Sequence, residues 1–559
     1  MAFPLRPPEQ VMRLARMGSF FATRLSFMPS LLRHMVARRW RIKRTRWEIN
    51  AEGFGRAVFA AKNGKWTYSL VAFSNDLAPE LRSDRVIAEA WDATFVLFDG
   101  VPTERDLDRL AENAPRQEAG RYLPSELVLS RANKSVRFFS HVVDRLASGQ
   151  QPDLDLLGSV GYLMRTTAVY GNGKFGVADR EKIASRPGLS GPFRAELLAV
   201  YLIRAFTHDL VEHIACCRAP KTFVPLRPDL KRHLGIGNST GLGMAPFLVS
   251  HPILIHNWMH ARETALARVR GQVQTSPERL TRFHELLDRA RRHVAEWDVA
   301  DVRQTERITE LRTDLDTLRS WLEADPEWCT QPSPWDGLYL RAEAELSLEA
   351  QELVVSLLLE AHPEQVDKLA DTMSTKDHEQ LAPAMSVRDL KALVQQHYAW
   401  ALEVDLARPE AQQRFWYVSE EKLEPRFGDR YQEAGADKEM PHAIARELQQ
   451  LWQALKDSEP QDSTAALLFQ HPELRRTIRR VQTVAQRPYA EIKDNLVAAD
   501  CLPIDLLRCK LSFFGAAKFD PKSDLWTRIN LYQGAPLPED LKSRQHLDWC
   551  FPVLPKEAA

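Results

Sequence analysis

Hydrophobic and polar residues alternate with a period of two near the N-terminus and with a helical period along most of the remaining chain. In residues 55–74 the runs GRAVFAAK and KWTYSLVAFS flank Asn63-Gly64, a pair favoured in type I′ hairpin turns. Residues 41–49 and 85–100 have the same strand character. These segments predict a small antiparallel sheet covered by the N-terminal helix.

After Gly100 the pattern is almost entirely helical. Thr103 followed by Asp106 has the spacing of a capping box. Apolar residues at i, i+3 and i+4 predict helices in 125–148, 153–169, 191–217, 244–270, 335–373, 386–405 and 441–457. Residues 276–323 are highly charged with a thin apolar seam, which is typical of a helical hairpin arm.

The pattern therefore predicts a mainly α, multi-lobed helical protein with a small N-terminal antiparallel β-sheet, α+β overall. Because 559 residues exceed the roughly 250–300 that one core accommodates, several regions are expected. They are a basic N-terminal helix with the sheet (1–101), a helical core with glycine-rich loops (102–273), the charged hairpin arm (274–325), and a C-terminal helical region with an aromatic-rich tail (326–559).

Composition restricts the class of protein further. The chain is 44% hydrophobic and 27% charged with a formal net charge of zero, which argues against nucleic-acid binding through bulk charge. No stretch approaches the roughly 18 charge-free residues of a transmembrane helix. The cysteines are scattered without a C-x-x-C pair, which predicts a cytoplasmic protein; they are Cys216, Cys217, Cys329, Cys501, Cys509 and Cys550.

The zero net charge conceals a basic N-terminus. Residues 1–47 contain eleven Lys and Arg residues against a single acid, Glu9. Because RRWRIKRTRWEIN continues into a strand pattern, we favour an arm docked against the acidic body or an anionic ligand. A surface or partner contact and a targeting segment are the alternatives.

The stretch GIGNSTGLGMAPFLVSHP (235–252) holds four glycines within nine residues. It completes neither G-x-G-x-x-G nor a P-loop, so neither NAD nor a P-loop nucleotide is indicated. We predict that it cradles an anion at a helix start, with ligands from Gly237, Asn238, Thr240 and Gly241. The alternative is a glycine-bent connection whose polar residues cap a helix.

A second glycine-rich stretch, RTTAVYGNGKFGVADR (165–180), has a similar character. Arg165 and Lys174 would clamp a carboxylate or phosphate through charge-assisted hydrogen bonds. Two such loops, each followed by a helix, predict one shared pocket. Alternatively, Lys174 is a solvated lysine of a turn.

Histidines at helical spacing are the remaining candidates. His256, His260 and Glu263 follow one helical stripe and would suffice as ligands for zinc or non-haem iron, although the H-E-x-x-H order is absent. His208 and His256 are candidates for acid–base catalysis, since histidine titrates near neutral pH. All of these histidines are alternatively packed or surface residues.

The segment NSTGLGMAP resembles the Gly-Ser-Ser-x-Met-Pro loop of the fumarase/aspartase lyases, with Ser239, Met244 and Pro246 as the nearest counterparts. The resemblance implies that Ser239 takes the substrate proton. It covers fewer than ten residues, extra residues separate the serine from the methionine, and Leu248–His251 replace the family's lysine and asparagine. It serves as an analogy and does not assign the chain to that family.

The leading hypothesis is a cytoplasmic enzyme that acts on a small anionic metabolite, bearing carboxylate or phosphate, in a pocket between helices 153–169, 191–217 and 244–270. Its chemistry would be acid–base catalysis by histidine. One alternative is an enzyme that depends on a divalent metal held by His256, His260 and Glu263. The other is a non-catalytic scaffold that uses the 276–323 arm and the basic N-terminus. The sequence does not identify the substrate, and it neither predicts nor excludes a homo-oligomer.

Overall fold

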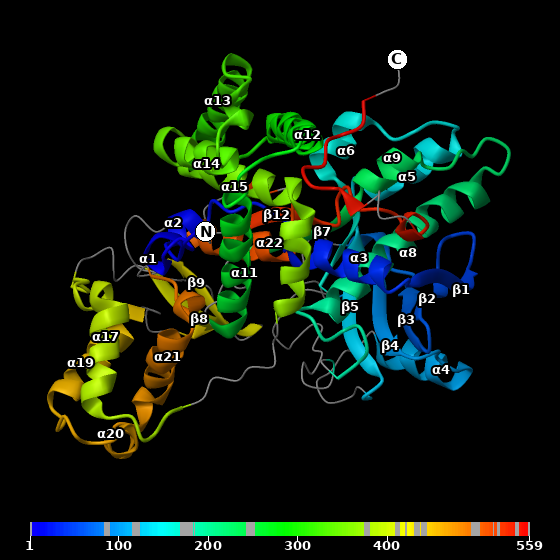
Figure 1. The fold of residues 1–559 in the computed structure, drawn as a ribbon. Coiled ribbons are helices and arrows are strands. Elements are labelled where there is room, and N and C mark those ends of the chain that lie inside the picture. The colour runs from blue at the N-terminus through cyan, green and yellow to red at the C-terminus, as the bar shows by residue number, and fades with distance from the viewer. Residues whose placement is uncertain are drawn as a thin grey trace.

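The fold was analysed in a computed structural model, which shows a mainly helical protein with one large sheet (Figure 1). It describes residues 3–82, 90–114, 123–167, 183, 185–241, 252–373, 381–407, 414–419, 422–429, 436–437, 444–493, 503–517, 519–521, 526–542 and 547–556.

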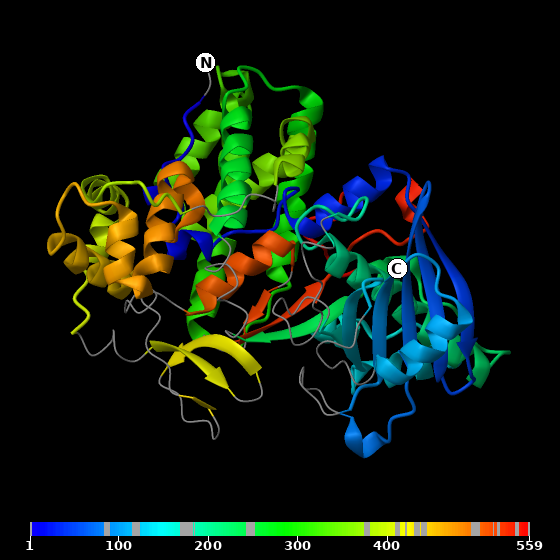
Figure 2. The ribbon, with the colours of Figure 1, turned by 90° about the horizontal axis from the view of Figure 1, so that it is seen from below.

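Within these residues nine strands form the large sheet, in the order β1-β2-β3-β4-β5-β6-β7-β12-β11. Every neighbouring pair is antiparallel except β6 and β7, which are parallel. The strands are β1 (Arg41–Ile49), β2 (Gly55–Asn63), β3 (Trp66–Ser74), β4 (Ala93–Asp99), β5 (Glu126–Lys134), β6 (Tyr162–Thr166), β7 (Gly235–Gly241), β11 (Phe519–Pro521) and β12 (Trp526–Leu531). A separate sheet contains β8 (Arg414–Ser419), β9 (Lys422–Asp429) and β10 (Ala436–Asp437), drawn in yellow and orange in Figure 2.

The N-terminal strands form as their periodicity predicts. β2 and β3 pair with Asn63 opposite Trp66, and Gly64 between them has φ +57°, the left-handed conformation that this turn requires. The predicted strand 41–49 is β1. Thr103 and Asp106 form a capping box at the start of α4 (Glu104–Asn113), with both reciprocal hydrogen bonds present.

The predicted fold class is wrong in its description of the sheet, which is neither small nor confined to the N-terminal region. β7, β11 and β12 come from residues 235–241 and 519–531, and the β6–β7 pair makes the sheet mixed. Glycines and turn residues dominate these segments, so their strand propensity is low, and pairing with distant strands decides their conformation. The helical part of the prediction stands.

Helices cover both faces of the sheet and extend from one end of it. α8 (Arg194–Arg218) crosses one face over β2–β7, and α4 covers the other face, where Leu107 and Leu110 are buried. The other helices nearest the sheet are α3 (Phe27–Ala37), α5 (Phe138–Ala147), α6 (Leu154–Val160), α9 (Pro228–His233) and α22 (Pro503–Phe514), with the short η1 (Pro79–Leu81) and η7 (Asp540–Lys542). The short α1 (Pro8–Val11) and α2 (Leu14–Met17) lie together, and α2 packs against α15 and α22.

A helical body adjoins the sheet and shares its main hydrophobic core. It consists of α11 (Pro252–Arg270), α12 (Pro277–Ala295), α13 (Val302–Ala324), η3 (Trp328–Thr330), α14 (Pro334–Glu345), α15 (Leu348–Ala361), α16 (Pro363–Val366) and η4 (Asp367–Thr372). The predicted hairpin arm is the pair α12–α13, which packs against α15 as well as against itself.

Four further helices form a second core of their own, centred on Leu390, Leu448, Leu451 and Ile478. They are α17 (Val387–Leu402), α19 (Ile444–Lys456), α20 (Thr464–Gln470) and α21 (Arg475–Gln486), with the short η5 (Pro472–Leu474) and η6 (Pro488–Ala490). Figure 1 shows this group apart from the sheet.

Two of the predicted helices are partly strands. Residues 125–148 divide into β5 and α5, and residues 153–169 contain α6 followed by β6. In each case the apolar residues fit both the helical period of about 3.6 residues and the strand period of two. The central position of β5 and β6 in the sheet decides in favour of the strand.

The basic N-terminus docks on acidic residues of the helical body. The Arg6 guanidinium donates to both carboxylate oxygens of Glu263 (2.7 and 2.8 Å) and to Glu352 (2.8 Å), and Arg16 also contacts Glu352 (2.6 Å). Arg262 completes this buried group. Among the described residues, no helix is both long and apolar enough to cross a bilayer.

Candidate functional site

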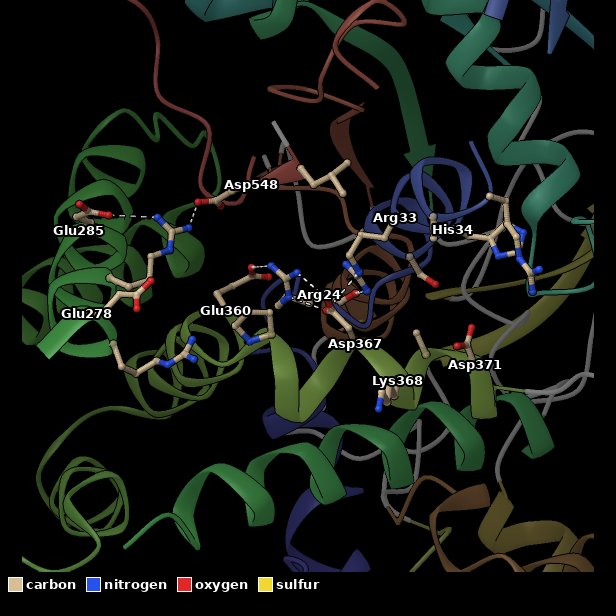
Figure 3. Close-up of a pocket in the computed structure, with 18 of the residues that line it drawn as sticks. Arg24, Arg33, His34, Glu278, Glu285, Glu360, Asp367, Lys368, Asp371 and Asp548 are labelled. Atoms are coloured by element: carbon tan, nitrogen blue, oxygen red, sulfur yellow. Dashed lines mark hydrogen bonds and ion pairs between the residues drawn. The ribbon is translucent and has the colours of Figure 1, made fainter. Parts of the chain in front are cut away.

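A cavity of about 1130 Å³ opens between α3, α12 and the segment from α15 to η4 (Figure 3). Most of the side chains that line it are charged. They are Arg24, Arg33, Arg38, Glu278, Arg279, Arg282, Glu285, Glu360, Asp367, Lys368, Asp371 and Asp548, together with His34.

The sequence of α3 explains how this wall forms. Phe27, Leu31, Leu32 and Met35 are buried in the core. The lining residues Ser30, Arg33, His34 and Ala37 follow the spacing i, i+3, i+4 and i+7, which places them on one other face of the helix.

Polar positions of α12 form the opposite wall. Glu278, Arg282 and Glu285 line the cavity at the same helical spacing, while Phe283 and Leu286 are buried behind them. Two amphipathic helices thus bury their apolar faces and leave a charged space between them.

Ion pairs occupy the centre of the cavity. Arg24 donates to both carboxylate oxygens of Asp367 (2.8 and 2.9 Å) and lies 3.6 Å from Glu360. Arg33 lies 3.3 Å from the same Asp367. Burial lowers the pKa of Arg33 to about 10, and the neighbouring Arg24 lowers it further in the same direction.

At one end of the cavity the cations lack partners. Arg38 and Lys368 are exposed lining residues that make no ion pair within the described part of the chain. Arg194, the first residue of α8, is 9% exposed, and among the described residues its guanidinium has no hydrogen-bond or ion-pair partner. Burial lowers its pKa, which the Asp371 carboxylate opposes and Arg38 reinforces. We call Arg38, Arg194 and Lys368 the cationic end; Arg194 does not line the cavity itself but lies near the lining residues His34, Arg38 and Asp371.

His34 lies beside this cationic end. Its Nε2 atom is buried and has no hydrogen-bond partner in the described structure. Burial lowers the pKa of His34 to about 4, with further lowering from Arg194 and Arg38. At neutral pH the side chain is therefore a neutral imidazole, and it would accept a proton only if a nearby negative charge offset the effect of the two arginines.

Near the other wall, possible metal-ligating atoms of Glu360, Asp548 and Cys550 lie within 4.8 Å of one another. Arginines already contact all three residues of this group. Arg24 faces Glu360, and Arg289 contacts both Asp548 (3.0 Å) and the Cys550 sulfur (3.4 Å).

The Cys550 thiol in this group is protonated. Burial, followed by the Glu360 charge, raises its pKa to about 12, and Sγ donates to Asp548 at 3.1 Å. A metal would need the thiolate and would have to displace the guanidinium groups, so we interpret the group as structural.

The structure separates the three residues of the predicted metal site. His256 and His260 remain close, with ring centroids 5.7 Å apart beside Tyr489. Glu263 gives both carboxylate oxygens to Arg6 instead. Burial, followed by His260, lowers the pKa of His256 to about 4, and its Nδ1 accepts from the Tyr489 backbone N–H at 3.2 Å.

The predicted catalytic His208 is buried on α8 under the segment that precedes β7. Its Nε2 has no hydrogen-bond partner in the described structure, and burial lowers its pKa well below the usual value. It lies near the buried Arg204, which donates to backbone carbonyls of Leu234 and Arg232 at 2.7 Å. This surrounding is packed and structural.

The predicted anion loop at 235–241 is the strand β7. Asn238, Ser239, Thr240 and Gly241 pair with successive residues of β12, so ladder hydrogen bonds use the backbone groups that were expected to bind an anion. A Cβ at Gly237 would come within 2.5 Å of the Tyr162 ring, which explains the glycine by close packing.

Arg165 lies next to this strand but outside the cavity described above. It is a buried residue of β6, and the parallel register places it opposite Gly237. β6 and β7 therefore end at the same end of the sheet. Lys174 lies outside the described residues.

The sequence pattern did not identify the residues that line the cavity as candidates. Arg33, His34 and Arg38 belong to the basic N-terminal segment, whose helical stripe at 30, 33, 34 and 37 was the available signal. Arg194 and Lys368 carry no local signal, because only the tertiary packing of α8 and η4 brings them near α3.

Comparisons with protein-family models, with curated proteins and with solved structures found no match to this chain. Interpretation of the site therefore depends on its own geometry and electrostatics.

Proposed function

We propose that the protein is an enzyme that binds a small phosphate- or carboxylate-bearing metabolite at the cationic end of the cavity. The observation that carries the proposal is Arg194, a buried residue (9% exposed) whose guanidinium has no hydrogen-bond or ion-pair partner among the described residues. An unpaired buried charge costs several kcal/mol, and an anionic ligand would recover much of that cost.

The surrounding residues fit an anion in size and charge. Arg38 and Lys368 add two cations that form no ion pair with any described residue, while Arg24 already binds the carboxylate of Asp367. Guanidinium groups bind phosphate and carboxylate through paired, charge-assisted hydrogen bonds. The cavity volume of about 1130 Å³ leaves room for a ligand larger than an inorganic ion.

His34 is the residue we assign to proton transfer. It is neutral at physiological pH and lies within electrostatic reach of Arg38 and Arg194, so a ligand held by these arginines would sit near the imidazole. A neutral imidazole takes a proton from the substrate, and a bound anion would stabilise the resulting imidazolium.

The proposal is tested by thermal-shift titration with inorganic phosphate, pyrophosphate and citrate. We expect concentration-dependent stabilisation of the native chain, because a ligand that binds only the folded state raises its stability. Arg38→Gln should weaken binding of the best ligand about tenfold, the loss of one charge-assisted contact.

The matched control is Lys221→Gln, which removes an exposed cation away from the cavity. Equal affinities in the two variants, or no stabilisation of the native chain by any of the three anions, would contradict the proposal.

A further inference from the structure

Exposed apolar side chains gather at one end of the large sheet. Trp66, Val101 and Leu123 are 51%, 64% and 45% exposed. Trp66 begins β3, Val101 follows the end of β4, and Leu123 precedes β5, so three neighbouring strands contribute one residue each.

The strand register places Trp66 and Val101 at the same end of the sheet. In the antiparallel pair β3–β4, Tyr68 lies opposite Asp99. Trp66 precedes Tyr68 by two residues and Val101 follows Asp99 by two residues, so both lie beyond this last pair.

The next strand brings a third apolar residue to this end. The backbone N–H of Asp99 donates to the carbonyl of Ser125 at 2.7 Å, and Leu123 lies in the turn that leads into β5. The three apolar side chains therefore lie at the same end of three neighbouring strands.

Basic residues lie at the same end of the sheet. Lys65 precedes Trp66 in the hairpin turn, Lys62 pairs with Arg41 across β1 and β2, and Arg39 lies in the turn before β1. All four side chains are exposed, and none makes an ion pair within the part of the chain that the structure describes.

Two acidic residues among those that the structure describes at this end are already neutralised. Asp99 pairs with Arg186 and Glu126 with Arg109, each at 2.5 Å. The four unpaired cations therefore give this end a local positive charge, although the net charge of the chain is zero.

Protection of an edge strand explains only part of this surface. Charged residues on β1 would discourage pairing with another sheet, but that role does not require an exposed tryptophan two strands away. An exposed tryptophan at this position lowers the solubility of the protein unless a partner covers it.

We propose that this end of the sheet, formed by Trp66, Val101, Leu123, Arg39, Arg41, Lys62 and Lys65, docks on a lipid surface that carries anionic head groups. Tryptophan prefers the boundary between head groups and acyl chains, aliphatic side chains insert there as well, and adjacent Lys and Arg residues bind the anionic lipids. A single-stranded nucleic acid fits less well, because it would stack on Trp66 but make no use of Val101 and Leu123.

The test is co-sedimentation of the full chain with phosphatidylcholine vesicles, with and without phosphatidylglycerol. The native chain should bind only the vesicles that contain phosphatidylglycerol, and binding should weaken as salt concentration rises. Trp66→Ser should lower the partition coefficient about tenfold, and Lys62→Glu with Lys65→Glu at least as much.

Matched controls remove equivalent groups elsewhere. Phe469→Ser removes a 90% exposed ring on α20, and Lys221→Glu with Arg388→Glu reverses two exposed charges; both should bind vesicles as the native chain does. All these positions are exposed, and circular dichroism verifies that each variant folds.

Absence of vesicle binding by the native chain would overturn the proposal. Equal binding by Trp66→Ser and Phe469→Ser would also overturn it, as would binding of a single-stranded oligonucleotide without binding of vesicles. Neither the cationic end nor His34 belongs to this surface, so the outcome is independent of the proposed function.

Discussion

Two arginine-rich regions of the molecule use the same chemical groups with opposite results. The first is the buried group that anchors the N-terminus; it consists of Arg6, Arg16, Arg262, Glu263 and Glu352. Glu352 is fully buried there and contacts three guanidinium groups, which hold its pKa far below the usual range against the effect of burial.

The second region is the cationic end of the cavity. Here Arg194 is nearly as buried but has no partner in the described structure, and its pKa shifts downward. The comparison shows that burial of arginine does not by itself indicate a binding site. A closed, paired group stabilises the fold, whereas an unpaired one beside a cavity is available to a ligand.

Glu352→Gln is expected to produce the largest effect on this comparison. It leaves Arg6, Arg16 and Arg262 short of one buried negative charge, so the free energy of unfolding should fall by about 3–5 kcal/mol. Urea unfolding measures this loss.

The control is Glu345→Gln, which breaks the half-exposed Arg341–Glu345 pair (3.2 Å) and should cost at most about 0.5 kcal/mol. Similar losses in the two variants would show that the buried group is not a structural anchor.

Arg194→Met should have the opposite effect on stability, because it should not destabilise the fold. Removing an unpaired buried charge should leave the free energy of unfolding unchanged within about 1 kcal/mol or raise it, while the affinity for pyrophosphate falls about 30-fold, or about 2 kcal/mol. Calorimetric titration and urea unfolding of the same variant separate the two effects.

Arg204→Met on the same helix provides the contrast. The Arg204 guanidinium donates to backbone carbonyls that include Leu234 and Arg232, so its loss should destabilise the fold by about 3 kcal/mol. If Arg194→Met destabilised the protein as strongly, Arg194 would be a structural residue.

A smaller effect is expected from the titration of His34. Its pKa is about 4 in the folded chain against an ordinary 6.5, so the unfolded chain binds the proton first as pH falls. The contribution of the neutral His34 to the free energy of unfolding is therefore fully present above about pH 6.5, and it decreases as pH falls from 6.5 to 4.

His34→Gln removes this contribution. Relative to the native chain, the variant should gain about 1 kcal/mol on going from pH 7 to pH 5, a value reduced for partial solvent screening. Because His256 and His362 also have pKa values of about 4, part of the pH dependence remains in the variant. Parallel stability curves for the two proteins would show that His34 does not titrate as assigned.

Local signals predicted the N-terminal strands and several helices correctly. The alternation in 41–49 and 55–74, the Asn63-Gly64 turn and the Thr103–Asp106 box each act within a few residues, so local propensity suffices to form them. α8 also matches its predicted span within a few residues, because a long apolar pattern of period 3.6 is hard to mistake.

The predicted sites depended on residues that share a segment, and tertiary contacts reassigned several of them. Glu263 follows His256 and His260 on one helix, yet Arg6 binds its carboxylate from more than 250 residues away. Gly237 suggested a flexible loop, but its missing side chain accommodates the Tyr162 ring within a sheet. Neither contact has a local signature.

The sequence by itself determined the strong short-range elements, the mainly helical character and the basic character of the N-terminus. Only the tertiary structure decided that β7, β11 and β12 join the sheet, that Arg194 of α8 lies near His34 of α3, and that Lys368 of η4 lines the same cavity as His34. The physical reason is that periodicity reports one element's own buried face, whereas strand pairing and the pairing of buried charges depend on partners distant in sequence.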